Sequence, residues 1–333
     1  MLYVVYSTSN SNYQSWQCKL LEWSFKKVNQ PGKLIRLCSY NTYESDRQFD
    51  ESSISEVIKL PDYRTRWTNY TSDVDKDYGI VNKTESLKYW LKTYQGLSDD
   101  DNVLFVDPDM IFLKKVDFKT TSGVIIGQRW IDEGAHESIH FKKYASHIID
   151  KIKPKSIFMY PYLATVGDLK KIIDRYTSLC YKMRIENYPH LWESEMFSLI
   201  ISSLENVTVR SLDNFGLCVT WNGNKLLNNN AFVDDSYLLH YPGDINDLNQ
   251  KKIFNKQDYT PFTLKKHWKR IDANKANSYI ERKFLSILDQ YNIEKLNQYY
   301  WEKPDLIDSL ELYNHNNCKN YVVFQPWPGG LIT

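Results

Sequence analysis

Two aspartates that flank a single proline follow a short apolar run in the first half of the chain. Asp107, Pro108 and Asp109 come directly after the apolar run Val103–Val106. A carboxylate pair with a one-residue spacer can share one hard divalent ion, Mn²⁺ or Mg²⁺, which usually completes its shell with substrate phosphates. The alternative is an ordinary solvated turn, since Asp and Pro are common at strand ends. The apolar flanks favour a site for a metal ion and a diphosphate.

A metal ion held by this acidic pair needs a further protein ligand, and His240 is the candidate. It closes the apolar run Tyr237–Leu239 and precedes Tyr241, Pro242 and Gly243. A histidine at a strand end before a tight turn can coordinate through one ring nitrogen. The alternative is a histidine of the core or the surface that binds no ligand.

A sheet must position these side chains, and the first half of the chain has the corresponding pattern. Strand-like runs alternate with segments in which apolar residues recur at helical spacing. Strands are predicted at 2–6, 34–38, 55–60 and 103–106, helices around 16–25 and 87–94, and a polar loop at 7–12. A β-α-β-α-β order is typical of an α/β fold, in which ligands bind at the carboxyl ends of the strands. The acidic pair follows such a strand end.

The second half of the chain keeps this mixed character. Strands are predicted at 123–127 and 237–239, and helices at 169–176, at 193–203 and from about 273 onward. There is no internal repeat and no long linker. The simplest organisation is one domain over residues 1–260 with a helical C-terminal extension over 261–333.

The composition is that of a folded globular protein. Of 333 residues 15% are aromatic, and only 12 are Gly and 11 are Pro, which excludes collagen-like, low-complexity and disordered classes. Because 42 Lys and Arg nearly balance 41 Asp and Glu, the net charge is +1 and no whole-chain field attracts nucleic acid or an anionic membrane.

The sequence also predicts a compartment. The apolar run after Met1 has only five residues, too short for a signal peptide, and no stretch approaches the ~18 apolar residues of a membrane helix. The five cysteines form no CxxC pair, so neither a disulfide framework nor a cysteine zinc site is predicted. Sequons at Asn69, Asn82 and Asn206 are interpreted as coincidental. We expect a cytoplasmic protein without a membrane partner; for a viral source this would be the host cytoplasm.

Six short motifs stand in one order along the chain. They are Tyr13–Cys18, Gly79–Lys83, Val106–Phe112, Tyr162–Leu169, Glu195–Phe197 and His240–Tyr241. Together they resemble the plant hydroxyproline O-arabinosyltransferase and peptidyl-serine galactosyltransferase family, over about residues 1–245. The resemblance implies a GT-A (Rossmann-like) glycosyltransferase domain, a UDP-sugar donor and dependence on a metal ion of the Mn²⁺ type.

The resemblance also implies roles for individual residues. Asp107, Asp109 and His240 match the positions expected to hold the metal, and Asp109 is counted among the catalytic residues for this reason. Glu195 matches an acidic residue near the reaction centre, where it would orient the acceptor hydroxyl or stabilise a cationic sugar. Without the resemblance, Glu195 reads equally well as an exposed helix carboxylate.

Donor contacts are expected from a second group of residues. Asn82 and Lys83 match an Asn–basic pair of the family, and Lys83 would place a cation near the diphosphate or the sugar. Ser7 and Thr8, after the first strand-like run, are further candidates, and Lys266 (or its neighbour Lys265) could contribute a cation from the C-terminal side.

The predicted function is transfer of arabinose, galactose or glucose from a UDP-sugar to a hydroxyl acceptor, with retention at the anomeric carbon as the family resemblance suggests. The acceptor would be a hydroxylated peptide. The alternative acceptor is a hydroxymethylated base in DNA, because the basic run Lys265–Arg270 contains Trp268, and such a run can bind phosphates and stack on a base.

Two other classes of function stay open. His136, Glu137 and His140 form a literal H-E-x-x-H, the helix signature of zinc proteases, although the flanking residues suit a solvated helix face better. A non-catalytic protein that binds a nucleotide sugar is the other possibility, in which the acidic pair would have no catalytic role.

Overall fold

The structure, a computed structural model, describes residues 1–40, 54–63, 79–130, 135–187, 193–219, 225–247, 249–256 and 272–302. The chain separates into two compact units, Met1–Gly243 and Asp244–Thr333, and each is described by itself. The domain boundary predicted after residue 260 lies outside the described residues and stays a prediction.

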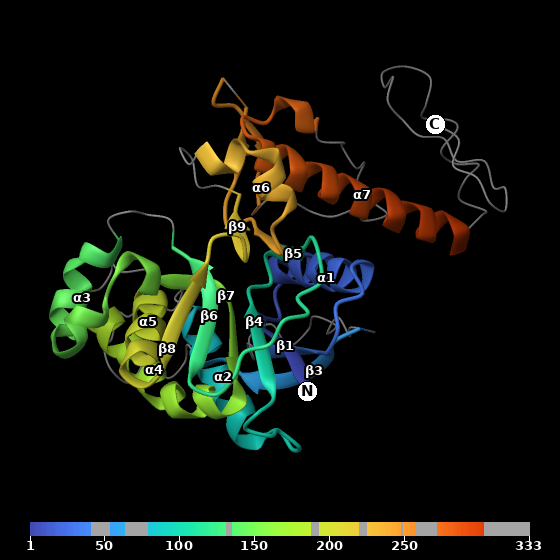
Figure 1. Ribbon diagram of the computed structural model, residues 1–333. Coiled ribbons are helices and arrows are strands. Elements are labelled where there is room, and N and C mark those ends of the chain that lie inside the picture. The colour runs from blue at the N-terminus through green and yellow to red at the C-terminus, as the bar shows by residue number, and fades with distance from the viewer. Residues whose placement is uncertain are drawn as a thin grey trace, which may run out of the picture. The chain divides into compact units, whose positions relative to one another are not determined.

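A seven-stranded sheet forms the centre of the first unit (Figure 1). In spatial order its strands are β3 (Glu56–Pro61), β2 (Lys33–Tyr40), β1 (Leu2–Ser9), β4 (Asn102–Val106), β7 (Phe158–Thr165), β6 (Val124–Arg129) and β8 (Thr208–Leu212). All strands run in one direction except β7, which is antiparallel to both of its neighbours. The strand order reverses between β1 and β4, and in α/β proteins this switch point is where ligands bind. The architecture agrees with the predicted α/β, GT-A (Rossmann-like) class.

The first strand is longer than predicted. Ser7, Thr8 and Ser9 pair in parallel with Leu37–Ser39 of β2, so the polar loop expected at 7–12 is wrong. The strand continues through polar residues because their backbone groups still complete the ladder, while the hydroxyl groups of Ser7 and Thr8 find buried partners. Helix α1 (Asn12–Lys27) then begins after Ser11, whose side chain accepts a hydrogen bond from the backbone of Gln14.

Strand β7 is the main element that the sequence did not predict. It is buried at every position, so it lacks the polar–apolar alternation of a half-exposed strand, and Pro161 argues against a central strand. The pairing of β7 with β6 shifts register between Gly127 and Gln128, close to the proline, which removes one donor from the ladder. Because β7 is antiparallel, its first residues lie at the same edge of the sheet as the carboxyl ends of β4 and β6.

Helices cover both faces of the sheet. The main ones besides α1 are α2 (Val81–Thr93), α4 (Val166–Glu186) and α5 (Ser194–Asn206), with shorter helices α3 (Ile139–Tyr144) and α6 (Asn230–Asp234). The crossover through α1 leads from β1 to β2 and the one through α2 leads back from β3 to β4, so right-handed connections place these two helices on opposite faces. Helices α2, α4 and α5 pack side by side (Figure 1). Thr165 caps α4 by accepting a hydrogen bond from the backbone of Asp168.

A small sheet stands beyond the end of β4. It consists of β5 (Met110–Phe112), β10 (Leu238–His240) and β9 (Gly216–Cys218), and α1 packs against β5. Gly216 is required where β9 approaches β7, because a Cβ atom at this position would lie 2.1 Å from Cδ of Pro161. Through this contact the small sheet packs closely against the large one.

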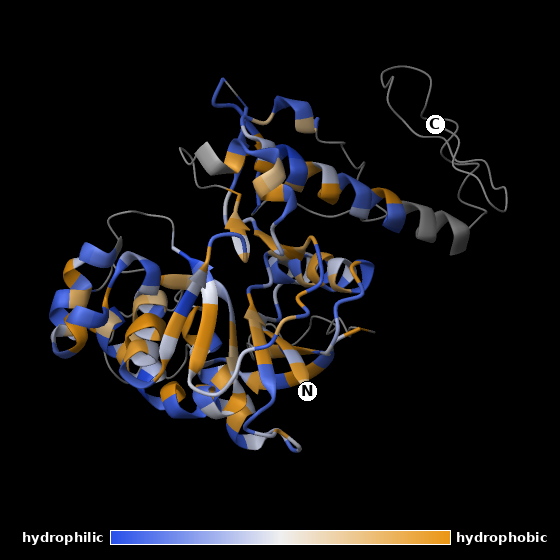
Figure 2. Cartoon of the chain, viewed as in Figure 1, coloured by the Kyte–Doolittle hydropathy of each residue, from blue (hydrophilic) through white to orange (hydrophobic). Residues whose placement is uncertain are grey.

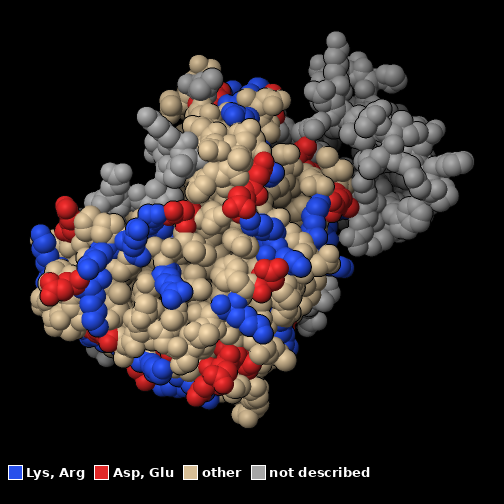
Figure 3. Space-filling model, in the orientation of Figure 1, with Lys and Arg blue, Asp and Glu red and all other residues tan. Residues whose placement is uncertain are grey.

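The strands of the first unit are predominantly apolar, and polar residues lie on the outer sides of its helices (Figure 2). The core is rich in aromatic rings, and Trp90 is fully buried in edge contact with Tyr3. Cys18, Cys38, Cys180 and Cys218 are buried free thiols. On the face drawn in Figure 3, basic and acidic side chains are interspersed, which fits the net charge of +1. Among the described residues, no helix has both the length and the apolar character needed to cross a membrane.

The second unit contains a long helix and a short hairpin. Helix α7 (Tyr279–Glu302) buries an apolar face that includes Ile280, Phe284 and Leu288, as the helical spacing predicts. Strands β11 (Ile245–Asn246) and β12 (Lys252–Phe254) pair antiparallel, and Phe254 of β12 makes an edge contact with Phe284.

Candidate active site

Strand pairing brings together three predicted metal ligands that are distant in the sequence. Asp107 and Asp109 form the turn between β4 and β5, and in the small sheet His240 of β10 pairs with Met110 of β5. The backbone N–H of Tyr241 also donates to the carbonyl of Asp109. As a result, Nε2 of His240 lies 3.3 Å from Oδ1 of Asp109 and 3.9 Å from Oδ2 of Asp107.

These three residues fit a divalent ion. One donor atom from each of Asp107, Asp109 and His240 can be chosen so that all lie within 4.8 Å of one another. In the part of the chain that the structure describes, this is the one group of three such donors. Two carboxylates and one imidazole suit Mn²⁺ or Mg²⁺ with room for further oxygen ligands, and the three side chains are largely buried, so their arrangement is fixed before a ligand arrives.

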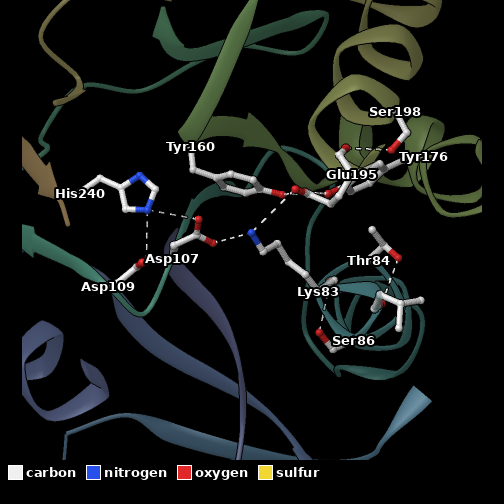
Figure 4. Close-up of polar contacts among 11 residues, drawn as sticks. Lys83, Thr84, Ser86, Asp107, Asp109, Tyr160, Tyr176, Glu195, Ser198 and His240 are labelled. Atoms are coloured by element: carbon white, nitrogen blue, oxygen red, sulfur yellow. Dashed lines mark hydrogen bonds and ion pairs between the residues drawn. The ribbon is translucent and has the colours of Figure 1, made fainter. Parts of the chain in front are cut away.

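Lys83 joins this group to a second buried carboxylate. It lies in the first turn of α2, and its Nζ is 2.7 Å from Oδ1 of Asp107 and 3.8 Å from Oε2 of Glu195 (Figure 4). The same ammonium stands 3.9 Å from the ring centroid of Tyr160. Burial alone would lower the pKa of Lys83, but the charges of Asp107, Glu195 and Asp109 outweigh it and raise the pKa. Lys83 therefore brings a positive charge to the site.

Glu195 lies in the first turn of α5 and is almost completely buried, so the alternative of an exposed helix carboxylate is wrong. The hydroxyl groups of Tyr160 and Tyr176 both donate to its Oε1. Burial raises the pKa of Glu195, and Lys83 and the two tyrosine hydroxyls oppose this effect without cancelling it. A carboxylate with a raised pKa, ion-paired inside a protein, is typical of a functional site.

Tyr160 and Tyr176 were not predicted as site residues. Tyr160 belongs to β7, the strand that the sequence analysis missed, and Tyr176 lies inside the predicted helix of α4. The sequence signal for Tyr160 is its place two residues before Tyr162, since the two side chains then share one face of a strand. That signal becomes usable only once β7 is recognised.

Ser7 and Thr8 lie at the carboxyl end of β1, at the switch point beside β4. Both are buried. The hydroxyl of Ser7 accepts a hydrogen bond from Ser86 of α2, and Oγ1 of Thr8 accepts one from Nε of Arg36. Both residues lie at the edge of the sheet where the sugar donor is expected to bind. Their contact with a donor stays a prediction.

The side chain of Asn82 organises the chain after β3. Its Oδ1 accepts from the backbone N–H of Tyr63 at 2.7 Å, and its Nδ2 donates to Oδ1 of Asp62 at 3.0 Å. Asn82 thereby fixes the start of α2, from which Lys83 projects. A direct contact of Asn82 with a donor also stays a prediction.

Two further groups of candidates remain. Lys265, Lys266 and the rest of the basic run at 265–270 lie outside the described residues. His136 and Glu137 end a 3₁₀ turn, and the extended backbone of Ser138 separates them from His140 in α3. A zinc-protease site needs both histidines on one face of a continuous helix, which this segment does not form.

A comparison with protein families confirms the resemblance that the six motifs predict. Residues 2–212 match the model of the hydroxyproline O-arabinosyltransferase family N-terminal domain. The chain belongs to this family.

Individual relatives are distant. Hydroxyproline O-arabinosyltransferase 1 of Arabidopsis thaliana is 23% identical over 257 residues, which cover 72% of this chain and 63% of the relative. Peptidyl serine alpha-galactosyltransferase of the same plant is 28% identical over 110 residues, covering 33% of this chain and 13% of the relative. The chain thus spans less than two thirds of the length of either protein. Among solved structures, the bifunctional glycosyltransferase WbbM matches with a TM-score of 0.45 and 10% identity, over 73% of this chain and 46% of its own.

Proposed function

We propose that the protein is a metal-dependent glycosyltransferase that moves a sugar from a UDP-sugar to a hydroxyl acceptor with retention at the anomeric carbon. The observation that carries this proposal is the meeting of Asp107, Asp109 and His240 beside the Lys83–Glu195 pair, at the edge of the sheet where nucleotides bind. Membership of the family supports it.

The donor side of the site is the acidic pair with its histidine and lysine. Asp107, Asp109 and His240 would hold Mn²⁺ or Mg²⁺, which when bound supplies Lewis-acid stabilisation of the departing diphosphate. Lys83 adds a fixed positive charge where negative charge develops on the leaving phosphate oxygen. Because this charge is largely buried and already oriented by its ion pairs, it requires little reorganisation during the reaction.

Glu195 acts on the sugar side. As the bond from the anomeric carbon to the phosphate oxygen breaks, positive charge develops on the sugar, and the carboxylate of Glu195 stabilises that charge. The acceptor oxygen forms its bond to the same carbon on the same face, and the departing phosphate oxygen takes the acceptor proton. Glu195 can also orient the acceptor hydroxyl through Oε2, the oxygen that faces Lys83.

The acceptor we propose is a hydroxyl group on a peptide. The names of the two plant relatives specify hydroxyproline and serine as the modified residues, and arabinose and galactose as the sugars. A DNA acceptor gains no support from the described residues, because the basic run at 265–270 on which it rests lies outside them.

A donor panel tests the proposal. UDP-arabinose, UDP-galactose and UDP-glucose are each incubated with the protein and Mn²⁺, and release of UDP is measured with and without a hydroxyproline peptide, a serine peptide or hydroxymethylated DNA. We expect one donor to be consumed, faster with a peptide, and the rate to fall at least ~100-fold on chelation and return with Mn²⁺. Consumption of no donor, or an unchanged rate after chelation, would contradict the proposal.

A further inference from the structure

One oxygen of the Glu195 carboxylate carries both of its tyrosine hydrogen bonds. Tyr160 of β7 and Tyr176 of α4 both donate to Oε1, and their phenolic oxygens lie 2.8 Å apart. All three residues are at most 2% exposed and come from three different elements. The two tyrosines therefore hold this one oxygen from two directions (Figure 4).

The other oxygen of this carboxylate points toward the rest of the site. Oε2 is the Glu195 atom that lies 3.8 Å from Nζ of Lys83, which in turn contacts Asp107. Tyr160 touches both partners, because its hydroxyl donates to Glu195 while the ammonium of Lys83 lies 3.9 Å from its ring centroid. Tyr160 thus lies between the largely buried ammonium of Lys83 and the buried carboxylate of Glu195.

We propose that Tyr160 and Tyr176 are positioning residues that occupy Oε1 of Glu195 and so direct Oε2 toward Lys83 and the reacting sugar. This inference rests on the proposed function, and it adds two residues to which that function assigns no role. A carboxylate that stabilises a developing charge is effective only if it does not rotate, and two charge-assisted hydrogen bonds from rigid phenols prevent rotation.

The same hydrogen bonds act on the protonation of Glu195. Donors to a carboxylate favour its charged form, so both tyrosines lower the pKa of Glu195 against the raising effect of burial. The charged and titratable groups that face this carboxylate are Lys83 from α2, Asp107 from the turn after β4, Tyr160 and Tyr162 from β7, and Tyr176 from α4. Removing a tyrosine hydroxyl therefore raises the pKa of Glu195, whereas a role limited to packing leaves it unchanged.

The experiment compares Tyr160→Phe, Tyr176→Phe and the double variant with wild type and a matched control. Tyr144→Phe is the control, because the Tyr144 hydroxyl donates to Glu186 at 2.7 Å away from the site. Turnover is measured as UDP release from the donor that wild type consumes fastest, across the acid limb of the pH profile of kcat/KM. The protonation of Glu195 is followed separately by its infrared carboxyl band, assigned by difference from Glu195→Gln.

We expect each single variant to lower kcat about tenfold and to move the acid limb and the infrared titration to higher pH, with a larger loss in the double variant. Tyr144→Phe should change neither. Acid limbs and infrared titrations that coincide with those of wild type in both single variants would overturn the inference while leaving the proposed function intact. A wild type that consumes no donor would instead contradict the proposed function, and the infrared titration would still decide the inference. The single variants suffice if the double variant fails to fold.

Discussion

Nζ of Lys83 lies 2.7 Å from Oδ1 of Asp107, while the other oxygen of the same carboxylate faces His240. Asp107 therefore belongs both to the candidate metal group and to the buried ion pair that leads to Glu195. The two parts of the site are coupled through one side chain, so replacing Lys83 should change the affinity for the metal ion.

Replacing Lys83 with Met should raise the affinity for Mn²⁺ about tenfold, on the order of 1–2 kcal/mol, because a buried positive charge beside the ligands is removed. Turnover should nevertheless fall about 100-fold, because the leaving diphosphate loses a cation. Calorimetric titration with Mn²⁺ and UDP release on the same samples check both effects. Lys83→Arg, which keeps the charge, is the control, and weaker Mn²⁺ binding in Lys83→Met would contradict the coupling.

The ionisation of Glu195 should make stability depend on pH in a defined direction. Its pKa is raised in the folded protein, so the native state holds this proton more tightly than the unfolded chain does. The favourable contribution is complete below the ordinary glutamate pKa of about 4.3 and is lost as pH rises through the raised folded pKa. The free energy of unfolding of Glu195→Gln, minus that of wild type, should therefore increase with pH in denaturant titrations.

Glu186 provides a control of opposite sign for that experiment. Hydrogen bonds from Tyr144 and Lys143 lower its pKa, so its contribution is present above the ordinary glutamate pKa and lost as pH falls through the lower folded one. The difference between Glu186→Gln and wild type should decrease as pH rises. A difference for Glu195→Gln that is flat, or that follows the trend of Glu186→Gln, would show that Glu195 is not a desolvated carboxylate.

The contact between Gly216 and Pro161 should be important for both stability and the site. An alanine Cβ at position 216 would lie 2.1 Å from Cδ of Pro161, so strand β9 would have to move, at a cost of ~1–3 kcal/mol in the free energy of unfolding. Since β9 pairs with β10, which carries His240, Mn²⁺ affinity should fall as well. Urea unfolding and Mn²⁺ titration measure the two effects.

Gly79→Ala is the matched control for this substitution, because among the described residues, chain neighbours apart, no heavy atom lies within 4 Å of a Cβ built there. It should unfold at the wild-type urea concentration. Equal midpoints for Gly216→Ala and Gly79→Ala would refute the argument from packing.

Much of the fold could be predicted from the sequence, because its elements carry the periodicities that burial imposes. The run Val103–Val106 is continuously apolar since β4 is covered on both faces, and α7 shows a helical apolar face. Strand β7 could not be predicted in the same way. It is also buried throughout, but Pro161 lies inside it and argues against a central strand. The register shift that accommodates the proline depends on the pairing with β6 and leaves no local pattern in the sequence.

The parts of the candidate site that could be predicted are those that a short stretch of sequence marks. Asp107 and Asp109 adjoin a recognisable strand end, and His240 follows another one. That His240 pairs with Met110, and so reaches the aspartates, depends on a register between distant strands that no local pattern specifies. The burial of Glu195 likewise depends on Tyr160 and Tyr176 from two other elements.

In the proposed function, Asp109 holds a metal ion on which sugar transfer depends. Asp109→Asn keeps the size of the side chain and removes its charge, and Asp99→Asn makes the same change at an acidic group that is 71% exposed and pairs with Lys170. Mn²⁺ binding and UDP release are measured on both variants and on wild type with the same UDP-sugar. We predict that Asp109→Asn loses at least ~100-fold in UDP release together with most of its Mn²⁺ affinity, while Asp99→Asn retains both. Turnover of Asp109→Asn at the wild-type rate would contradict the account.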